Sequence, residues 1–186
     1  MKKSKVTILT SGGIDSTVCI AFYINQGFIV EGLFIDYGQP ALLRERKAIK
    51  KIAKHYKITV HEVKWKGVIE KQSGLIIGRN AFFLLSALME SPPNTRIIAL
   101  GIHKGTDYPD CSKLFYKRMQ SVLDIYTKGT VQFGAPFIDF TKAEIWHLGK
   151  EYNVPFELTY SCEKGLKQPC GKCLSCKDLE KLNASA

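Results

Sequence analysis

The chain has 186 residues, of which 45% are hydrophobic, and a net charge of +10 from 27 Lys and Arg against 17 Asp and Glu. This length supports one domain with a substantial hydrophobic core and is too short for two full-sized domains. No run approaches the roughly eighteen apolar residues of a membrane span, and the apolar run after the N-terminal lysines is too short for a signal peptide. We therefore expect a soluble, cytoplasmic protein without a membrane partner. The positive charge permits acidic partners but does not choose among nucleotides, proteins and nucleic acid.

Five apolar runs rich in β-branched residues alternate with helical patterns along the chain. They predict strands at residues 6–9, 28–35, 58–63, 96–100 and 131–137, and helices at 17–26, 42–56, 80–91, 112–126 and 141–152. Thr141 and Glu144 form a capping box at the start of the last of these helices. The alternation predicts an α/β fold, with an open, mostly parallel, Rossmann-like five-stranded sheet and helices on both faces.

Residues 10–17, Thr-Ser-Gly-Gly-Ile-Asp-Ser-Thr, follow the first predicted strand and open the first helix. Such a turn directs backbone N–H groups and a helix N-terminus at one point, which suits a polyanion. It lacks the lysine of the Walker loop. A loop that holds the β,γ-pyrophosphate as a unit leaves the α-phosphorus open to attack, so AMP passes to the substrate. We predict that the pyrophosphate of ATP and its Mg²⁺ are bound by Ser11, Gly12, Gly13, Asp15 and Ser16, with Asp15 and Ser16 also taking part in catalysis.

Polar clusters also follow the second and fourth strands, at residues 36–39 and 103–110. Because the carboxyl ends of parallel strands meet at one edge of the sheet, these clusters should share a crevice with the first. Asp36 is a candidate for the nucleoside side of the ATP site, or it is a turn-forming residue before Gly38. His103 and Lys104 are candidates for proton transfer or phosphate binding, although a histidine at a strand end often has neither role.

Four cysteines crowd the end of the chain, where hydrophobic periodicity is lost. Their spacing is C-x7-C-x2-C-x2-C, and they are Cys162, Cys170, Cys173 and Cys176. Four thiolates favour a closed, structural Zn²⁺ site; an iron–sulfur cluster and two disulfides are the alternatives. We predict a nucleotide-binding domain at 1–160 and a zinc module at 161–186. Cys19 is predicted to be a core residue.

Six motifs occur in a characteristic order: Ser-Gly-Gly-Ile-Asp-Ser at 11–16, Asp-Tyr-Gly-Gln at 36–39, Gly-Arg-Asn at 78–80, Tyr-Pro-Asp-Cys at 108–111, Pro-Phe-Ile-Asp-Phe-Thr-Lys-Ala-Glu-Ile at 136–145, and the four-cysteine tail. Together they resemble the 7-cyano-7-deazaguanine synthase family of PP-loop ATP pyrophosphatases, from one end of the chain to the other. The resemblance implies an adenine nucleotide alpha hydrolase-like fold, queuosine precursor synthesis, bound zinc, magnesium with ATP, and a homodimer.

The resemblance also implies a reaction. The carboxylate of 7-carboxy-7-deazaguanine is adenylated, ammonia displaces AMP to give an amide, and a second activation at the amide oxygen gives the nitrile. The chemistry is coherent, because a carboxylate becomes a good electrophile only when its oxygen is converted into part of a leaving group. One ATP site can serve both activations.

The resemblance places Arg79 and Asn80 beside the α-phosphate and the deazaguanine, where a cation would stabilise developing charge. It makes Asp110 an acceptor for the N–H edge of the heterocycle and Tyr108 a stacking partner. The alternatives are an N-capping Asn80 with an exposed Arg79, and a simple turn around Pro109.

The segments at 64–78 and 101–107 are shorter than in typical family members. One alternative is therefore a shortened paralogue that stops at the amide or couples the acyl group to another amine, such as a protein N-terminus, with a partner protein completing the crevice. A second is a tRNA-modifying PP-loop enzyme with Cys111 as a sulfur carrier. RNA is the less expected partner, because the chain has no spare RNA-binding domain.

Overall fold

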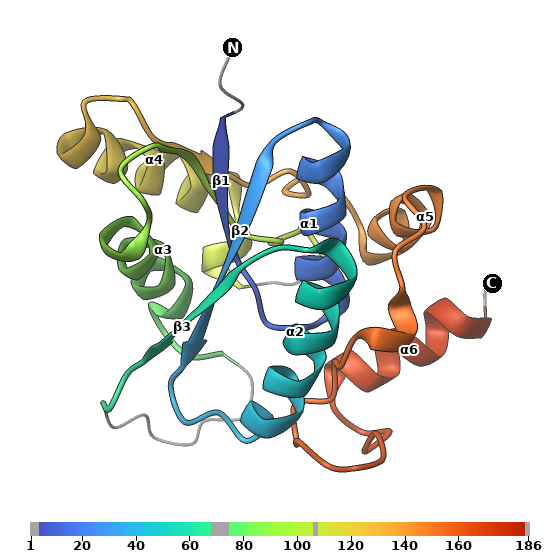
Figure 1. Cartoon of the computed structure of the whole chain (residues 1–186). Helices are drawn as coiled ribbons and strands as arrows, with labels where there is room; N and C mark the ends of the chain where they lie inside the picture. Colours follow the sequence, from blue (N-terminus) through green and yellow to red (C-terminus); the bar gives the residue numbers. More distant parts are fainter. Residues whose placement is uncertain (1–3, 68–74, 106–107, 185–186) are drawn as a thin grey trace.

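The computed structural model describes residues 4–67, 75–105 and 108–184. A five-stranded sheet lies at its centre, in the order β3-β2-β1-β4-β5 (Figure 1). The strands are β1 (Lys5–Leu9), β2 (Ile29–Asp36), β3 (Val60–Lys64), β4 (Thr95–Ala99) and β5 (Gln132–Gly134). All four pairings are parallel, with Ile8 of the central strand aligned with Gly32 on one side and Ala99 on the other. The predicted α/β class with a parallel sheet is confirmed.

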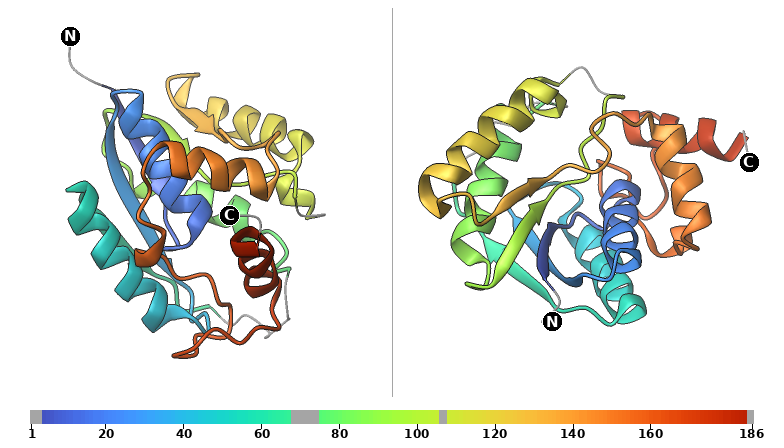
Figure 2. Two further views of the ribbon diagram at one scale, coloured as in Figure 1. Left: turned by 90° about the vertical axis from the view of Figure 1, so that its right-hand side faces the viewer. Right: turned by 90° about the horizontal axis from the view of Figure 1, so that it is seen from above.

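Helices cover both faces of the sheet, as Figures 1 and 2 show. One face carries α1 (Ile14–Asn25), α2 (Leu42–Tyr56) and α5 (Lys142–Glu151), and the other carries α3 (Arg79–Glu90) and α4 (Lys113–Thr127). Two short 3₁₀ turns, η1 (Pro109–Cys111) and η2 (Phe156–Leu158), and a final helix, α6 (Leu174–Ala184), complete the described part of the chain.

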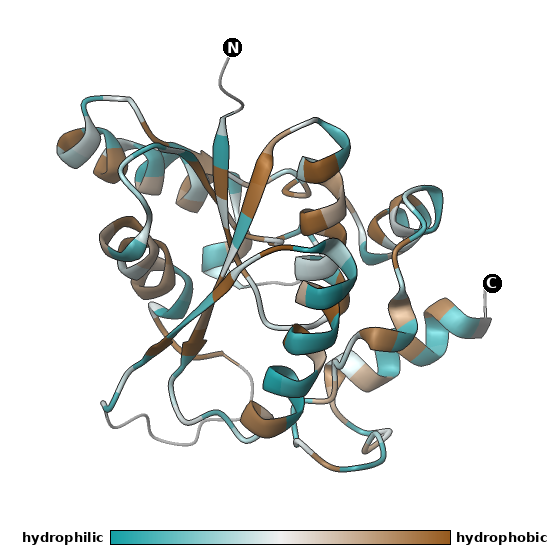
Figure 3. Cartoon of the chain, viewed as in Figure 1, coloured by the Kyte–Doolittle hydropathy of each residue, from teal (hydrophilic) through white to brown (hydrophobic). Residues whose placement is uncertain are grey.

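The strands separate two apolar cores. Val6 and Ile8 of β1 point into the cluster beneath α1, α2 and α5, whereas Leu9 joins the cluster beneath α3 and α4. Strands that are buried on both faces need apolar residues at nearly every position. Figure 3 shows brown over much of β2, beside an α2 that is largely teal, whereas the edge strand β3 is mostly hydrophilic. The sheet therefore provides a rigid base for the loops at the carboxyl ends of its strands.

The fifth strand and the C-terminal helix differ from the expectation based on the sequence. The fifth strand has three residues instead of seven, because Pro136 has no N–H for the ladder and the chain turns there, with Ile138 donating to the carbonyl of Ala135. The helix α6 was not predicted. Its moderate apolar face packs Leu179 and Leu182 against the α1 side of the core.

The cysteine-rich segment packs directly on the nucleotide-binding part of the chain. The Tyr160 N–H donates to the Gly12 carbonyl over 2.9 Å. Gly165, at φ +67°, lies so close to Pro40 that a Cβ there would be 2.2 Å from the Pro40 carbonyl oxygen. The division at residue 160 stays a prediction. None of the helices in the described ranges is long and apolar enough to cross a membrane.

Candidate functional site

A cavity of about 480 Å³ lies at the carboxyl edge of the sheet. Its walls come from the loop after β1, the end of β2, the first turns of α2 and α3, the segment after β4, the start of α5 and the cysteine-rich segment. Those predicted site residues that line it are Ser11, Gly13, Asp15, Ser16, Arg79, Asn80, His103 and Tyr108. The structure thus brings together polar clusters that the sequence places far apart.

The loop at residues 11–16 is closed by its own hydroxyls. The Ser16 Oγ donates to the Gly13 carbonyl over 3.1 Å and accepts from the Ser11 N–H over 3.3 Å. Gly12 adopts φ +73° under α2, where a Cβ would meet the Glu45 carbonyl oxygen at 3.1 Å. Gly13 is the N-cap of α1 and has no side chain to cap it. The first N–H groups of α1, which lack intrahelical carbonyl partners, are thus available to an anion.

Asp15 is held by a lysine from the far end of the chain. Both of its carboxylate oxygens lie 2.5 Å from Lys142 Nζ, and the Nε2 atom of His103 lies 3.9 Å from Oδ2. Lys142 is the first residue of α5, directly after the capping-box residue Thr141. Gly101 lets the segment after β4 pack closely against the backbone of Asp15, because a Cβ at Gly101 would lie 2.9 Å from the Asp15 carbonyl oxygen.

His103 is buried at 8% exposure behind this ion pair. Burial lowers the pKa of His103, and Lys142 lowers it further, while Asp15 and Asp178 oppose the shift. The Nδ1 atom accepts from the Gly105 N–H over 3.0 Å, which places the proton of the neutral ring on Nε2, facing Asp15. The geometry gives His103 a neutral imidazole whose Nε2–H faces the carboxylate without a hydrogen bond to it.

The opposite wall carries Arg79 at the start of α3. Its guanidinium lies 6.0 Å from the centre of the Phe83 ring and interacts with Tyr37. Burial raises the pKa of Tyr37, and Arg79 opposes the shift. The Nε atom of Arg79 is buried and has no hydrogen-bond partner among the described residues. An unpaired guanidinium donor in a cavity wall suits an anionic group of a ligand.

Glu45 is a wall residue that the sequence analysis did not identify. Its Oε2 accepts from Gln39 Nε2 over 2.7 Å, and burial raises the pKa of its carboxyl group. Lys142, Gly101 and Glu45 were all missed. Lys142 carried a usable signal, because it opens a helix that follows a strand end.

Three predicted site residues, Gly12, Asp36 and Asp110, are not among those that line the cavity. Asp36 is buried, with Oδ1 accepting from the Gly38 N–H over 3.1 Å and Oδ2 paired with Arg46 over 3.1 Å. Asp110 is 8% exposed in η1, next to Cys111, which does line the cavity. A role for either carboxylate in binding stays a prediction, and Lys104 likewise does not line the cavity.

The four C-terminal cysteines form a cluster that can hold a metal ion. Their sulfur atoms all lie within 4.8 Å of one another, and Cys170 Sγ and Cys176 Sγ are 3.9 Å apart. Four sulfurs at a Zn–S distance of about 2.3 Å would be about 3.8 Å apart in a tetrahedron. Backbone N–H groups of Lys172 and Cys173 donate to Cys170 and lower its pKa to about 6. The donor set and its spacing therefore fit a tetrahedral thiolate site.

Comparisons with known proteins identify the family of this chain. The family model described as "Queuosine biosynthesis protein QueC" matches residues 5–76 and 68–182. A 7-cyano-7-deazaguanine synthase from Thermoplasma volcanium is 31% identical, covering 93% of this chain and 83% of that protein. The protein of the same name from Archaeoglobus fulgidus is 32% identical, covering 92% and 82%.

Among solved structures, an NMN synthetase from Francisella tularensis superposes with a TM-score of 0.56 at 18% identity, covering 98% of this chain and 77% of that one. At this identity the likeness supports the fold alone. The family match extends over nearly the whole chain, and the relatives above 30% identity are covered over most of their length. The chain therefore belongs to the queuosine biosynthesis protein QueC family, a family of ATP-dependent enzymes that form a carbon–nitrogen bond.

Proposed function

We propose that this chain adenylates 7-carboxy-7-deazaguanine with ATP, lets ammonia displace AMP to give the amide, and activates the amide oxygen for elimination to the nitrile. One observation supports this most directly. A single cavity joins the loop at 11–16 to Arg79, Asn80 and Tyr108, so a nucleotide and a heterocycle can lie in contact there. The relatives named 7-cyano-7-deazaguanine synthase supply the substrate class.

In this proposal the pyrophosphate of ATP lies at the N-terminus of α1, against the backbone N–H groups and the hydroxyls of Ser11 and Ser16. Mg²⁺ bound with ATP would be held by Asp15 and would neutralise part of the phosphate charge. Lys142 positions the Asp15 carboxylate through its two contacts of 2.5 Å. No side chain of the loop reaches between the β- and γ-phosphates, which leaves pyrophosphate to depart as a unit.

The acyl half of the reaction lies on the α3 side. The unpaired Nε of Arg79 is suited to the charge that develops on the α-phosphate or on the substrate carboxylate. Asn80 and Tyr108 contact the heterocycle in the proposal, by hydrogen bonding and stacking. In the proposal Asp110 accepts hydrogen bonds from the N–H edge of the heterocycle, and Asp36 lies on the nucleoside side. Neither residue is among those that line the cavity. Ammonia attacks the acyl carbon, the bond to AMP breaks, and the ammonium proton leaves to solvent.

We assign zinc to the four-cysteine cluster, with a structural role. A closed set of four thiolates leaves no coordination position for water or substrate. The bond energy of such a site would hold a segment that buries little apolar surface. We further propose, from the family resemblance, a homodimer in the cytoplasm.

A shortened paralogue is the second candidate. The family model matches in two segments that meet at residues 68–76, and the alignment with the Thermoplasma volcanium protein runs over 202 positions against 186 residues in this chain. Residues present in that relative are therefore missing here. Such a protein would stop at the amide, or pass the acyl group to another amine such as a protein N-terminus.

Mass spectrometry of an incubation with ATP, Mg²⁺, 7-carboxy-7-deazaguanine and ammonium tests the proposal. We expect two AMP and two pyrophosphate for every nitrile formed, because the proposal consumes one ATP in each of its two activations. AMP with the amide alone would favour the shortened paralogue. The absence of AMP formation would contradict adenylation of this substrate and direct the search to RNA or a missing protein partner.

A further inference from the structure

The loop at 11–16 contains no lysine, so cations for the phosphates must come from other elements. Within the described ranges, four residues that line the cavity can carry positive charge: Arg79, His103, Lys142 and Lys164. Lys142 is paired with Asp15, and burial keeps His103 largely neutral. Arg79 lies on the α3 wall, against Phe83. Among these four residues, Lys164 is the one that both carries a permanent charge and belongs to the cysteine-rich segment.

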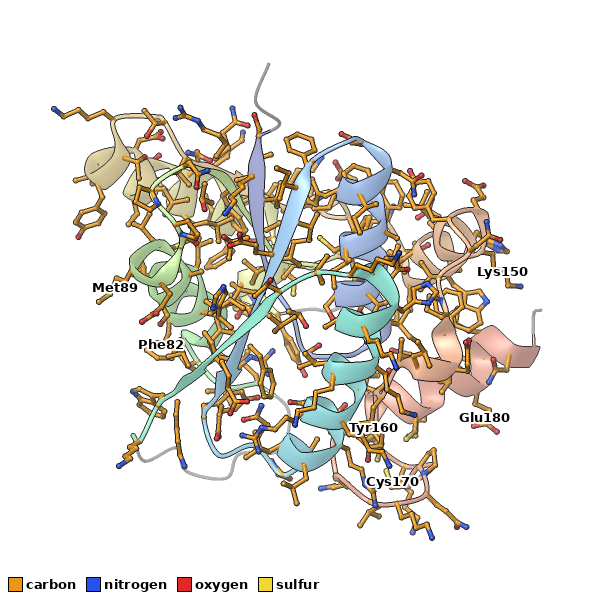
Figure 4. The ribbon with its side chains drawn as sticks, in the orientation of Figure 1. Phe82, Met89, Lys150, Tyr160, Cys170 and Glu180 are labelled. Carbon is orange, nitrogen blue, oxygen red and sulfur yellow. The ribbon has the colours of Figure 1, made fainter. Side chains whose placement is uncertain are left out.

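The segment at 160–164 runs directly beside the loop. It is anchored by the hydrogen bond from the Tyr160 N–H to the Gly12 carbonyl. A Cβ placed on Gly13 would lie 3.7 Å from the Tyr160 carbonyl oxygen and 3.9 Å from Ser161 Oγ. Figure 4 labels Tyr160 beside α2 and Cys170 just beyond it, on the same side of the molecule. Ser161 therefore lies beside the N-terminus of α1, and Lys164, three residues further on, lines the same cavity.

From this placement we infer that Ser161 and Lys164 bind the pyrophosphate of the nucleotide, as the second wall of a site whose first wall is the loop at 11–16. The inference rests on the proposed ATP site and adds residues from the cysteine-rich segment to it. The Ser161 hydroxyl donates to a phosphate oxygen, and the Lys164 ammonium supplies the charge that a Walker lysine supplies elsewhere. No ion pair joins Lys164 to a carboxylate in the described part of the chain, so its charge is available to a ligand.

The metal cluster holds this wall in place. Lys164 lies two residues after the cluster cysteine Cys162, whose sulfur accepts hydrogen bonds from the backbones of Lys164 and Cys170. The neighbouring Gly165 packs against Pro40 at the beginning of the α2 region. Metal bound at the cluster would thus hold Ser161 and Lys164 in position to bind phosphate. Bound nucleotide would then raise the affinity for the metal by the same factor as the metal raises the affinity for the nucleotide.

Calorimetry with ATP, inorganic pyrophosphate and adenosine, each in the presence of Mg²⁺, tests the inference on the full chain. We expect Lys164→Ala to weaken ATP and pyrophosphate binding about threefold to tenfold, a range reduced by the exposure of the side chain. Ser161→Ala should weaken both about twofold to fivefold. Adenosine has no phosphate, so its affinity should not change. Lys164→Arg should restore most of the loss, and Lys164→Ala should flatten the salt dependence of pyrophosphate binding.

Lys167→Ala is the matched control, because Lys167 is an exposed lysine of the same segment that does not line the cavity. Metal content is measured for every variant, so that a loss of the cluster is not mistaken for a loss of a phosphate contact. Unchanged pyrophosphate affinity in metal-loaded Lys164→Ala and Ser161→Ala would overturn the inference. An equal loss of adenosine and pyrophosphate would overturn it too. Failure of the wild-type protein to bind ATP would instead contradict the proposed function itself.

Discussion

The loop at 11–16 and the cysteine-rich segment both line one cavity but are held in place in different ways. The loop follows β1 and opens α1, where Ile8, Ile14 and Val18 are at most 3% exposed. Between Cys162 and Cys176, by contrast, no residue is buried, and Leu166 and Leu174 are about half exposed at 52% and 49%. Apolar burial fixes the first region, whereas the second buries little apolar surface and, in the proposed zinc site, would be held by bonds to the metal.

Because of this difference, we expect substitutions in the two regions to have different effects. A substitution in the loop should remove chemistry and leave the fold intact, because the surrounding core is unaffected. A substitution in the cluster should remove structure first and binding as a consequence. Four substitutions test this comparison, in order of decreasing expected effect.

Asp15→Ala should have the largest effect. We expect AMP formation to fall by about a thousandfold or more, because the variant loses the proposed ligand for Mg²⁺ and leaves Lys142 unpaired in the cavity. The thermal midpoint and metal content should remain close to those of the wild type. Asp139→Ala, which breaks an exposed ion pair with Lys113, is the control for carboxylate loss. Retained turnover in Asp15→Ala would remove Asp15 from the mechanism.

Cys173→Ser should break the second region. We expect loss of bound metal, lower solubility and faster proteolysis after residue 160, since three thiolates hold zinc less firmly than four. Far-UV circular dichroism should retain the signal of the sheet and its helices. Cys111→Ser, outside the cluster, should keep its metal. A folded, metal-loaded but inactive Cys173→Ser protein would contradict a structural role for the site.

Asp110→Asn sharpens the assignment on the α3 side of the cavity. We expect the affinity for 7-carboxy-7-deazaguanine to fall about threefold to tenfold with little change for ATP, because a carboxylate accepts two N–H groups that an amide cannot both match. Competition binding with the two ligands measures this. Equal losses for both would place Asp110 in the support of the turn at η1 instead.

His103 should make the smallest and most pH-dependent contribution. Its native pKa lies below the ordinary value of 6.5, chiefly because of burial, so the unfolded chain takes up the proton first as the pH falls. Stability should therefore decrease as the pH is lowered through about 6.5 and below. His103→Gln lacks this titration, and its thermal midpoint should fall less than that of the wild type between about pH 7.5 and about pH 5.5. If the thermal midpoints of the wild type and His103→Gln change with pH in parallel, the protonation of His103 does not contribute to the pH dependence of stability.

Much of the site was predictable from local patterns. The loop at 11–16, the capping box of Thr141 and Glu144, and the four-cysteine spacing each depend on residues close in sequence, and all three motifs form in the structure. The strand order was not predicted, because pairing depends on contacts between distant segments. The helix α6 was missed because its weak apolar face becomes recognisable only against the core that it covers.

The sequence alone was enough for the alternation of strands and helices, the turn at 11–16 and the clustering of four cysteines, since each follows from the periodicity or spacing of neighbouring residues. The tertiary structure was needed to show that Lys142 pairs with Asp15 across 127 positions, that Asp36 is turned toward Arg46, and that Ser161 lies beside Gly13 with Lys164 lining the same cavity. The physical reason is that the partner of a side chain depends on which chain segments the core and the cysteine cluster bring together. These segments are distant in sequence, so their contacts depend on the whole fold.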